Sequence, residues 1–203
     1  MNVFKMEVIK TAEALHKSSH GIFKIVVYRN EVSRKEHAVL IKGDVNDKND
    51  VPVRIESDCI TGIVLDSLEC ECKDQLKGSF DILSKSENGL IIYLRDEGRG
   101  HGLTIKVKAL ANKNKGHDTL EAVEKLGLAT DIRDYKDAAN IIKDLGINSV
   151  KLITNNPDKI AKLREHNVIV SDRIPIEIPV TEHTRKHLKA KRDKANHFFN
   201  QEL

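Results

Sequence analysis

The first half of the chain alternates short apolar runs with polar turns, a pattern typical of β-strands. β-branched residues in partial alternation predict strands at 22–29 and 38–42. The polar cluster GDVNDKND at 43–50 predicts a turn, which leads into a third strand at 51–57. LIIYLR at 90–95 is a short and nearly unbroken apolar run, which favours a buried strand.

Helical periodicity first appears between the third and fourth of these strands. Leu76, Phe80 and Leu83 stand at positions i, i+4 and i+7, so they share one face of a helix over 74–85. The apolar face of such a helix needs a partner surface to bury it. We therefore expect this helix to pack on the predicted strands.

The second half alternates helices and strands more regularly. Helical patterns at 118–126 and 135–145 each end at a glycine, a common C-terminal stop. Strands are predicted at 149–154 and 168–174, with Pro157 in the first turn of the helix between them. This order predicts a mixed α/β fold, in which a β-rich N-terminal half packs on an α/β layered C-terminal half.

The length of the chain predicts its domain organisation. A chain of 203 residues can bury a substantial core, so we expect one domain over 1–203. Any subdivision is expected near 87–89, in the loop SENG. The basic tail 182–203 is interpreted as a helix with a solvated Lys/Arg face, the alternative being contact with a phosphate or a partner subunit.

Composition and charge narrow the classes of partner. Hydrophobic residues make up 39% and charged residues 32%, as in ordinary globular proteins. An aromatic content of 4% argues against stacking on single-stranded nucleic acid, and a net charge of +3 is too small to indicate DNA binding. No long apolar run is free of charge, and residues 1–10 lack the features of a signal peptide. We expect a cytoplasmic protein with no nucleic-acid or membrane partner.

The three cysteines form the most informative cluster of reactive side chains. Cys59 follows a predicted strand, and Cys70 and Cys72 stand just before a predicted helix, whose N-terminus favours thiolate over thiol. Three thiolates would leave the fourth position of a tetrahedral zinc ion open for water, as in catalytic sites. Two other interpretations stay open: a structural site completed by His101 or His117, and cysteines that are merely buried.

Ordered motifs around these cysteines carry a family resemblance. RIESDCITG, CECKDQL, DEGRGHGL, LG-ATDIRDY and LITNNPDK resemble GTP cyclohydrolase II, from about residue 20 to the C-terminus. The resemblance implies hydrolysis of GTP to formate, pyrophosphate and 2,5-diamino-6-ribosylamino-pyrimidinone 5'-phosphate, the first step of riboflavin biosynthesis. It also implies a homodimer and zinc held by the three cysteines. Because a pyrophosphate leaving group usually needs a divalent ion, we expect magnesium with the triphosphate. A dihydroxybutanone phosphate synthase domain accompanies this one in some relatives, and we expect none within these 203 residues.

The resemblance assigns roles to individual residues. Asp131 matches the proton acceptor, and Arg133 matches the nucleophile toward the α-phosphate. A guanidinium stays protonated and is a poor nucleophile, so a phosphate clamp aided by Asp131 is the alternative role for Arg133. The residues that match GTP contacts are Arg54, Ile55, Glu56, Ser57, Asp58, Gln75, Glu97, Gly98, Arg99, Thr119, Thr154 and Lys159.

Chemistry is consistent with several of these assignments. Arg54, Arg99 and Lys159 are cations suited to phosphate oxygens, and the chain has no P-loop motif that would bind phosphates by itself. The carboxylate of Glu97 could accept hydrogen bonds from the guanine ring N–H and amino group, and Gln75 could serve the carbonyl edge.

Some positions depart from the family pattern. Leu110 stands where the family carries a tyrosine linked to completing the reaction, while Glu56 replaces a histidine, Asp58 a glutamate and Val123 an asparagine. Three hypotheses therefore remain. The protein is a riboflavin-pathway GTP cyclohydrolase II, a paralogue that stops at the formylated pyrimidine or serves another pathway, or a non-catalytic GTP-binding protein.

Overall fold

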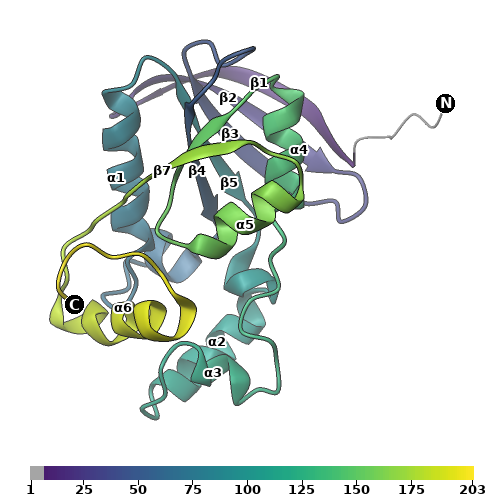
Figure 1. The fold of residues 1–203 in the computed structure, drawn as a ribbon. Coiled ribbons are helices and arrows are strands. Elements are labelled where there is room, and N and C mark those ends of the chain that lie inside the picture. The colour runs from purple at the N-terminus through teal and green to yellow at the C-terminus, as the bar shows by residue number, and fades with distance from the viewer. Residues whose placement is uncertain (1–6) are drawn as a thin grey trace.

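A single seven-stranded sheet forms the centre of the molecule in the computed structural model, which describes residues 7–203 (Figure 1). Residues 1–6, part of the segment used above to exclude a signal peptide, lie outside the described residues. The strands are ordered β1-β2-β3-β5-β4-β6-β7 across the sheet. Their bounds are β1 Val8–Ser18, β2 Gly21–Asn30, β3 Glu36–Lys42, β4 Val51–Ser57, β5 Gly89–Leu94, β6 Val150–Ile153 and β7 Val170–Ile174.

The sheet is mixed. β1, β2, β3 and β5 pair antiparallel in that order, whereas β5, β4, β6 and β7 pair parallel. Parallel neighbours require crossover connections, and helices supply these connections. The helical segments are η1 Ile60–Val64, α1 Cys72–Ser84, η2 Glu97–Gly100, α2 Leu103–Lys113, α3 Glu121–Glu124, α4 Lys136–Asp144, α5 Pro157–Glu165 and α6 Glu182–Ala195.

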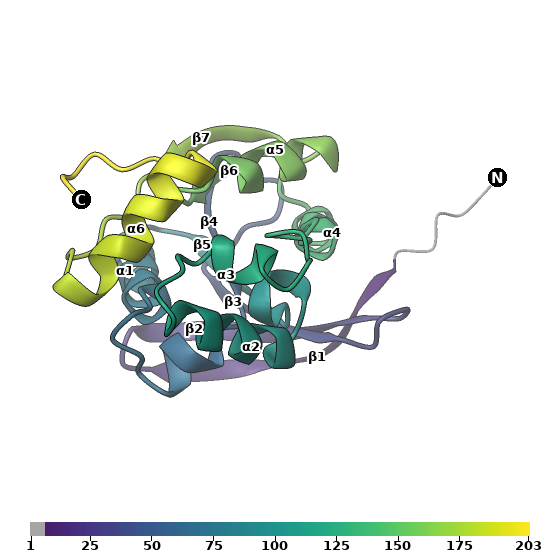
Figure 2. The same ribbon diagram turned by 90° about the horizontal axis from the view of Figure 1, so that it is seen from below.

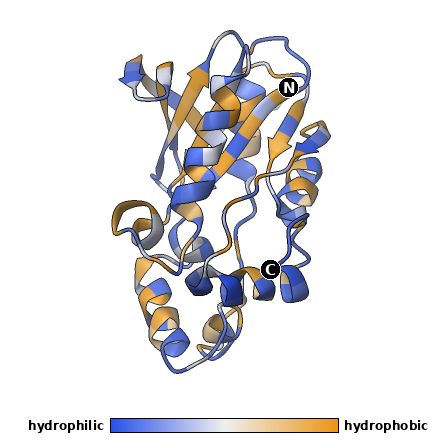
Figure 3. Cartoon of the chain, turned by 90° about the vertical axis from the view of Figure 1, so that its left-hand side faces the viewer, coloured by the Kyte–Doolittle hydropathy of each residue, from blue (hydrophilic) through white to orange (hydrophobic). Residues whose placement is uncertain are grey.

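Helices cover both faces of the sheet. α1 buries Leu83 against Ile91 and Ile153 on one face. On the other face, α4 and α5 bury Ile142 and Leu163 in a larger cluster with the strands. Figure 3 shows hydrophobic stretches along the strands of the sheet. Burial of this apolar surface is the main favourable contribution to folding, and it produces a three-layered α/β structure.

The remaining helices lie at one end of the sheet. Figures 1 and 2 place α2, α3 and α6 together at the end where β4 points. This is the carboxyl end of the parallel strands, the usual position of ligand sites in α/β sheets. In the part of the chain that the structure describes, none of the helices has the length and apolar character needed to span a bilayer.

The structure confirms the mixed α/β class and most predicted elements, but it differs in four places. β1 was not predicted, because nearly all its side chains are exposed and hydrophobic alternation is absent. α2 was not predicted either, because its apolar residues alternate as in a strand. The helix predicted at 118–126 is reduced to α3. The helix predicted at 74–85 begins earlier, so that Cys72 is its first residue.

Candidate metal centre and active site

A pocket opens at the carboxyl ends of β4, β5 and β6, where the predicted site residues converge. Except for Ile55, every residue assigned a site role above lines this pocket. The side chain of Ile55 is fully buried in the core, and its carbonyl oxygen accepts a hydrogen bond of 2.6 Å from Lys159. Residues spread over a hundred positions of the sequence are therefore brought to one cavity.

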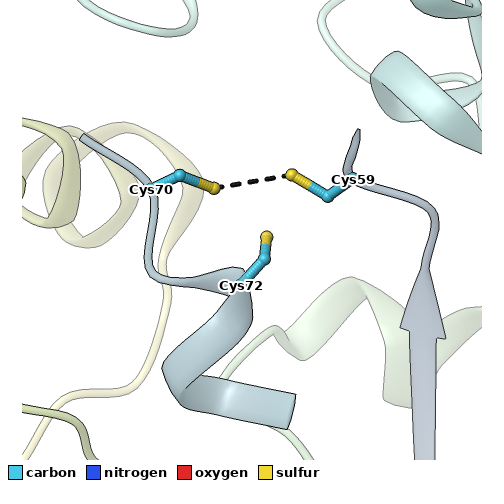
Figure 4. A group of neighbouring side chains, drawn as sticks. All are labelled: Cys59, Cys70 and Cys72. Carbon is cyan, nitrogen blue, oxygen red and sulfur yellow. Dashed lines mark hydrogen bonds between the residues drawn. The ribbon is translucent and has the colours of Figure 1, made fainter. Parts of the chain in front are cut away.

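The three cysteines converge on one point at the edge of this pocket. Cys59 follows β4, while Cys70 and Cys72 come from the start of α1, and their sulfur atoms face one another (Figure 4). All three Sγ atoms lie within 4.8 Å of one another, and those of Cys59 and Cys70 are 3.5 Å apart. A tetrahedral zinc ion with Zn–S bonds of about 2.3 Å requires sulfur atoms about 3.8 Å apart. The cluster could therefore hold a metal ion such as zinc.

Gly62 makes room for this cluster. It is buried in η1, and a Cβ added there would collide with Sγ of Cys70 and lie 3.2 Å from Sγ of Cys59. Only a residue without a side chain lets the backbone lie so close to the two sulfur atoms. The turn after Cys59 is thus shaped around the sulfur cluster.

Charge at the cluster favours a thiolate. Hydrogen bonds from the thiols of Cys70 and Cys72, together with the ammonium of Lys106, lower the pKa of Cys59. Nζ of Lys106 lies 3.0 Å from Sγ of Cys59 and 2.7 Å from Oε1 of Glu97. The thiolate is the form of cysteine that binds metal.

A histidine does not complete the cluster. Among residues 7–203, the only group of metal-binding side chains of this kind consists of the three cysteines. Nε2 of His101 lies 2.8 Å from the carbonyl oxygen of Ala129, and Nδ1 of His117 is 3.9 Å from Glu121. The alternative of a structural site closed by His101 or His117 therefore has no support in the geometry. Three ligands are the number used by catalytic zinc sites, which keep a position open.

The EGRG loop borders the metal cluster through Glu97. Oε2 of Glu97 accepts a hydrogen bond of 2.8 Å from the backbone N–H of Ile60, next to Cys59. Gly98 and Arg99 both adopt left-handed backbone conformations, which place the Arg99 side chain in the pocket. At Gly100 an added Cβ would lie 2.8 Å from Ile132, so this glycine lets the loop lie against the segment that carries Asp131 and Arg133.

Arg54 lies deeper than a freely available phosphate ligand would. It is 3% exposed and donates two hydrogen bonds to Oε2 of Glu56, at 2.9 and 2.6 Å. It donates two more, to Oε1 of Gln75 at 3.0 Å and to the carbonyl oxygen of Ile153 at 3.1 Å. The buried pair of Arg54 and Glu56 therefore orients Gln75 toward the pocket.

Asp131 and Arg133 form a two-point ion pair. Nε of Arg133 donates to Oδ1 of Asp131 at 2.9 Å, and Nη2 pairs with Oδ2, while Nη1 donates to Ser57 at 3.0 Å. Burial alone would raise the pKa of Asp131, but the hydrogen bonds and charge of Arg133 outweigh it and lower the pKa. Burial alone would lower the pKa of Arg133, but the hydrogen bonds to Asp131 outweigh burial and raise it. Both groups are charged, and the guanidinium is held in a fixed orientation.

Other pocket residues are also held by the protein. Lys159 is 7% exposed, and burial, reinforced by the charge of Arg54, lowers its pKa. Thr154 follows β6 and accepts a hydrogen bond of 3.0 Å from the backbone N–H of Asn156, which caps α5. The hydroxyl of Tyr93 donates a hydrogen bond of 2.9 Å to Oδ1 of Asp58, the residue before Cys59. The pocket is therefore a preorganised group of polar side chains.

The pocket also contains residues that the motifs did not single out. Lys106 comes from the unpredicted helix α2. His187, Lys191 and His197 come from the C-terminal tail, and Oγ1 of Thr119 lies 2.5 Å from Nδ1 of His187. The interpretation of the tail as a solvated face therefore applies to only one side of α6. The available signal in the sequence was the apolar Leu188 among the lysines and histidines of this stretch.

The fold and the site together define a class of protein: an α/β protein in which a three-cysteine cluster that could hold zinc borders a pocket rich in cations. The particular family follows from comparison with known sequences. The model of the GTP cyclohydrolase II family matches residues 9–175. The chain belongs to this family and is an enzyme of the GTP cyclohydrolase II type, which confirms the resemblance found in the sequence.

Individual relatives differ in length. The GTP cyclohydrolase-2 of Picrophilus torridus is 45% identical over 182 residues, which cover 90% of this chain and 94% of the relative. The riboflavin biosynthesis protein RibBA of Bacillus cereus is 40% identical over 193 residues, and this chain spans about half of it, 49%. Among solved structures, the chain resembles RibBX, a two-domain 3,4-dihydroxy-2-butanone 4-phosphate synthase from A. baumannii, with a TM-score of 0.46, 16% identity and coverage of 84% of this chain and 41% of that one.

Proposed function

We propose that this protein catalyses the zinc-dependent opening of the imidazole ring of GTP. The products are formate, pyrophosphate and 2,5-diamino-6-ribosylamino-pyrimidinone 5'-phosphate, and the reaction is the first step of riboflavin biosynthesis. The observation that carries the proposal is the three-cysteine cluster, which has no fourth protein ligand among the described residues and faces the same pocket as Arg99, Arg133 and Lys159. One pocket thus offers both a metal position and cations for a triphosphate.

The cysteine end of the pocket is proposed to receive the guanine base. Zinc, when bound by Cys59, Cys70 and Cys72, supplies Lewis-acid activation of water. Glu97 and Gln75 both line the pocket, where Lys106 holds Glu97 and Arg54 holds Gln75. A carboxylate and an amide offer acceptors and donors for the guanine edge, so a base without matching groups would leave buried polar atoms unpaired.

The cation end is proposed to receive the phosphates. Arg99, Arg133 and Lys159 line the pocket, and a guanidinium fork suits phosphate oxygens. Because Asp131 holds Arg133 protonated and oriented, we assign Arg133 the role of a phosphate clamp and not of a nucleophile. Asp131 is assigned as its positioning residue, with proton acceptance as the role inherited from the family resemblance. Ser57, Asp58, Thr119 and Thr154 complete the proposed GTP contacts.

A second candidate function rests on Leu110. This side chain lines the pocket and is 36% exposed, so it is accessible to a ligand. Leucine has no hydroxyl with which to donate or accept a proton, whereas the family resemblance places a tyrosine there. The second candidate is therefore an enzyme that opens GTP but stops at the formylated pyrimidine.

One assay separates these functions. The purified protein is incubated with GTP, zinc and magnesium, and formate and pyrophosphate are measured. Release of both supports the proposed function, and pyrophosphate without formate supports the second candidate. A protein that binds GTP and releases neither is a non-catalytic GTP-binding protein, which contradicts the proposal. Cys70→Ser should lose both zinc and ring opening.

The wider setting is proposed from the same resemblance. We propose a homodimer in the cytoplasm, where reducing conditions keep cysteines as thiols. Magnesium is proposed to accompany the triphosphate, because a pyrophosphate leaving group gains from a divalent cation. Residues 1–203 are proposed to act as one domain, in keeping with the single sheet that joins the strands on both sides of 87–89.

A further inference from the structure

The C-terminal tail forms a wall of the pocket although it lies outside residues 9–175, the part of the chain matched by the family model. α6 and the residues after it contribute His187, Lys191 and His197 to the lining. In Figures 1 and 2 this helix lies at the same end of the sheet as α2 and α3. The tail therefore forms part of the site, and its contacts show which of its side chains is free to contact a ligand.

Buried charge fixes α6 against the metal cluster. Glu71 lies between Cys70 and Cys72 and is fully buried. Its Oε1 forms an ion pair with Nζ of Lys191. Its Oε2 lies 2.9 Å from Nε2 of His187, but the angle between the two groups does not allow a hydrogen bond. A buried carboxylate needs such partners, because an unpaired one is strongly destabilising. His187 and Lys191 are thus occupied by Glu71.

The chain then turns back into the pocket. Asn196 adopts a left-handed conformation at the end of α6. The backbone N–H of His197 donates a hydrogen bond of 3.1 Å to the carbonyl oxygen of Lys191. The backbone N–H of the next residue, Phe198, donates a hydrogen bond of 2.8 Å to the carbonyl oxygen of Asn155. The centroid of the Phe198 ring lies 4.9 Å from the guanidinium carbon of Arg173. His197 is therefore held on both sides, and its position among the lining residues is set by the fold.

The imidazole of His197 is available to a ligand. Within residues 7–203 its ring makes no hydrogen bond or ion pair, and its aromatic neighbour is Phe199, with ring centroids 6.2 Å apart. Burial, followed by the positive charges of Lys191 and Lys159, lowers the pKa of His197 to about 3. The charge of Arg99 acts in the same direction. A neutral imidazole with a free N–H thus stands near the basic side chains of Lys191, Lys159 and Arg99.

We propose that His197 is a further phosphate-binding residue of this enzyme, presented by the tail to the anionic end of GTP in the pocket that Arg99 and Lys159 also line. The proposal rests on the proposed function for the identity of the ligand. A neutral N–H donor adds a hydrogen bond to phosphate without adding repulsion to a pocket that is already cationic. Bound phosphate would offset the neighbouring positive charges, so that the ring could also gain a proton and strengthen the contact.

The test measures binding separately from turnover. Zinc-loaded wild type, His197→Ala and His197→Gln are titrated with magnesium pyrophosphate and with guanosine, and the KM and kcat for GTP are determined. The exposed His16 on β1 provides the control variant His16→Ala. We expect His197→Ala to weaken pyrophosphate binding and to raise the KM by about tenfold, the loss of one hydrogen bond to a charged group. Guanosine affinity and zinc content should not change, and His197→Gln, which keeps an N–H donor, should recover most of the loss.

The outcomes separate this proposal from the proposed function. Pyrophosphate affinity within twofold of wild type in His197→Ala overturns the assignment of His197, and so does an equal loss of guanosine affinity. Selective loss of pyrophosphate affinity in a protein that releases no formate from GTP supports His197 and contradicts the ring-opening function. A wild type that binds neither GTP nor pyrophosphate overturns both.

Discussion

Nζ of Lys106 lies 3.0 Å from Sγ of Cys59 and 2.7 Å from Oε1 of Glu97, so one ammonium group joins the sulfur cluster to the EGRG loop. Three thiolates around a divalent ion leave a net negative charge, which this ammonium offsets. We predict that Lys106→Met lowers zinc affinity about 10- to 100-fold, the usual effect of losing a partner of a metal ligand. Chelator competition measures this affinity.

A neighbouring lysine provides the control for this prediction. Lys108 lies on the same helix and is exposed. Lys108→Met removes the same charge from α2 without touching Cys59, so its zinc affinity should match that of wild type. Equal losses in the two variants would mean that the net charge of α2, and not the contact with Cys59, sets the affinity.

Gly62 is predicted to be indispensable for metal binding. Its missing side chain leaves the space that the sulfur atoms of Cys59 and Cys70 occupy. Gly62→Ala should therefore abolish stoichiometric zinc, measured by atomic emission. The matched control is Gly78→Ala in α1, where the new Cβ would meet Ile176 at an ordinary 3.5 Å. Gly78→Ala should retain zinc and gain about 0.5–1 kcal/mol in the free energy of unfolding.

The ion pair of Asp131 and Arg133 predicts a pH dependence of stability. The pKa of Asp131 in the folded protein lies below its ordinary value of 3.8. Its contribution to stability is therefore complete above the pKa of the unfolded chain and is lost as the pH falls through the folded pKa. Urea unfolding should show Asp131→Asn less stable than wild type by a constant amount above about pH 5, with the difference shrinking below about pH 4. A difference that grows with acid would contradict the sign of the shift.

The docking of α6 is predicted to depend on Lys191. Removing its ammonium leaves Glu71, which is fully buried, without its Lys partner. Lys191→Met should lower the free energy of unfolding by about 3–5 kcal/mol, and adding Glu71→Gln should restore part of it. Lys189→Met, at an exposed position of the same helix, should change stability little. If the double variant is no more stable than the single one, the buried pair does not account for the loss.

Leu110 is predicted to limit proton transfer during formate release. Leu110→Tyr places a hydroxyl in the pocket and should raise the rate of formate release relative to that of pyrophosphate. Leu110→Phe adds a ring of nearly the same size without the hydroxyl and should not have this effect. A quenched assay that measures both products over time distinguishes the two variants. The same gain in both would point to packing instead of proton transfer.

The sequence motifs predicted most of the site, because each motif places several of the reactive or ligand-binding residues close together along the chain. Cys70 and Cys72 stand at the start of a periodic helix, and the glycines of the EGRG loop mark a backbone that approaches a ligand. Spacing alone could not say whether His101 or His117 completes the metal cluster. It also could not show that Arg54 is enclosed by Glu56, because that depends on packing.

The sequence by itself determined the α/β class, the cysteine cluster and the family, since hydrophobic periodicity and local motifs are properties of neighbouring residues. Only the tertiary structure decided what the C-terminal tail does. Its lysines and histidines read as a solvated face, because the partners lie far away in the sequence: Thr119 is 68 positions from His187, and Glu71 is 120 positions from Lys191. Contacts over such separations arise when the sheet gathers the ends of its strands, and no local pattern encodes them.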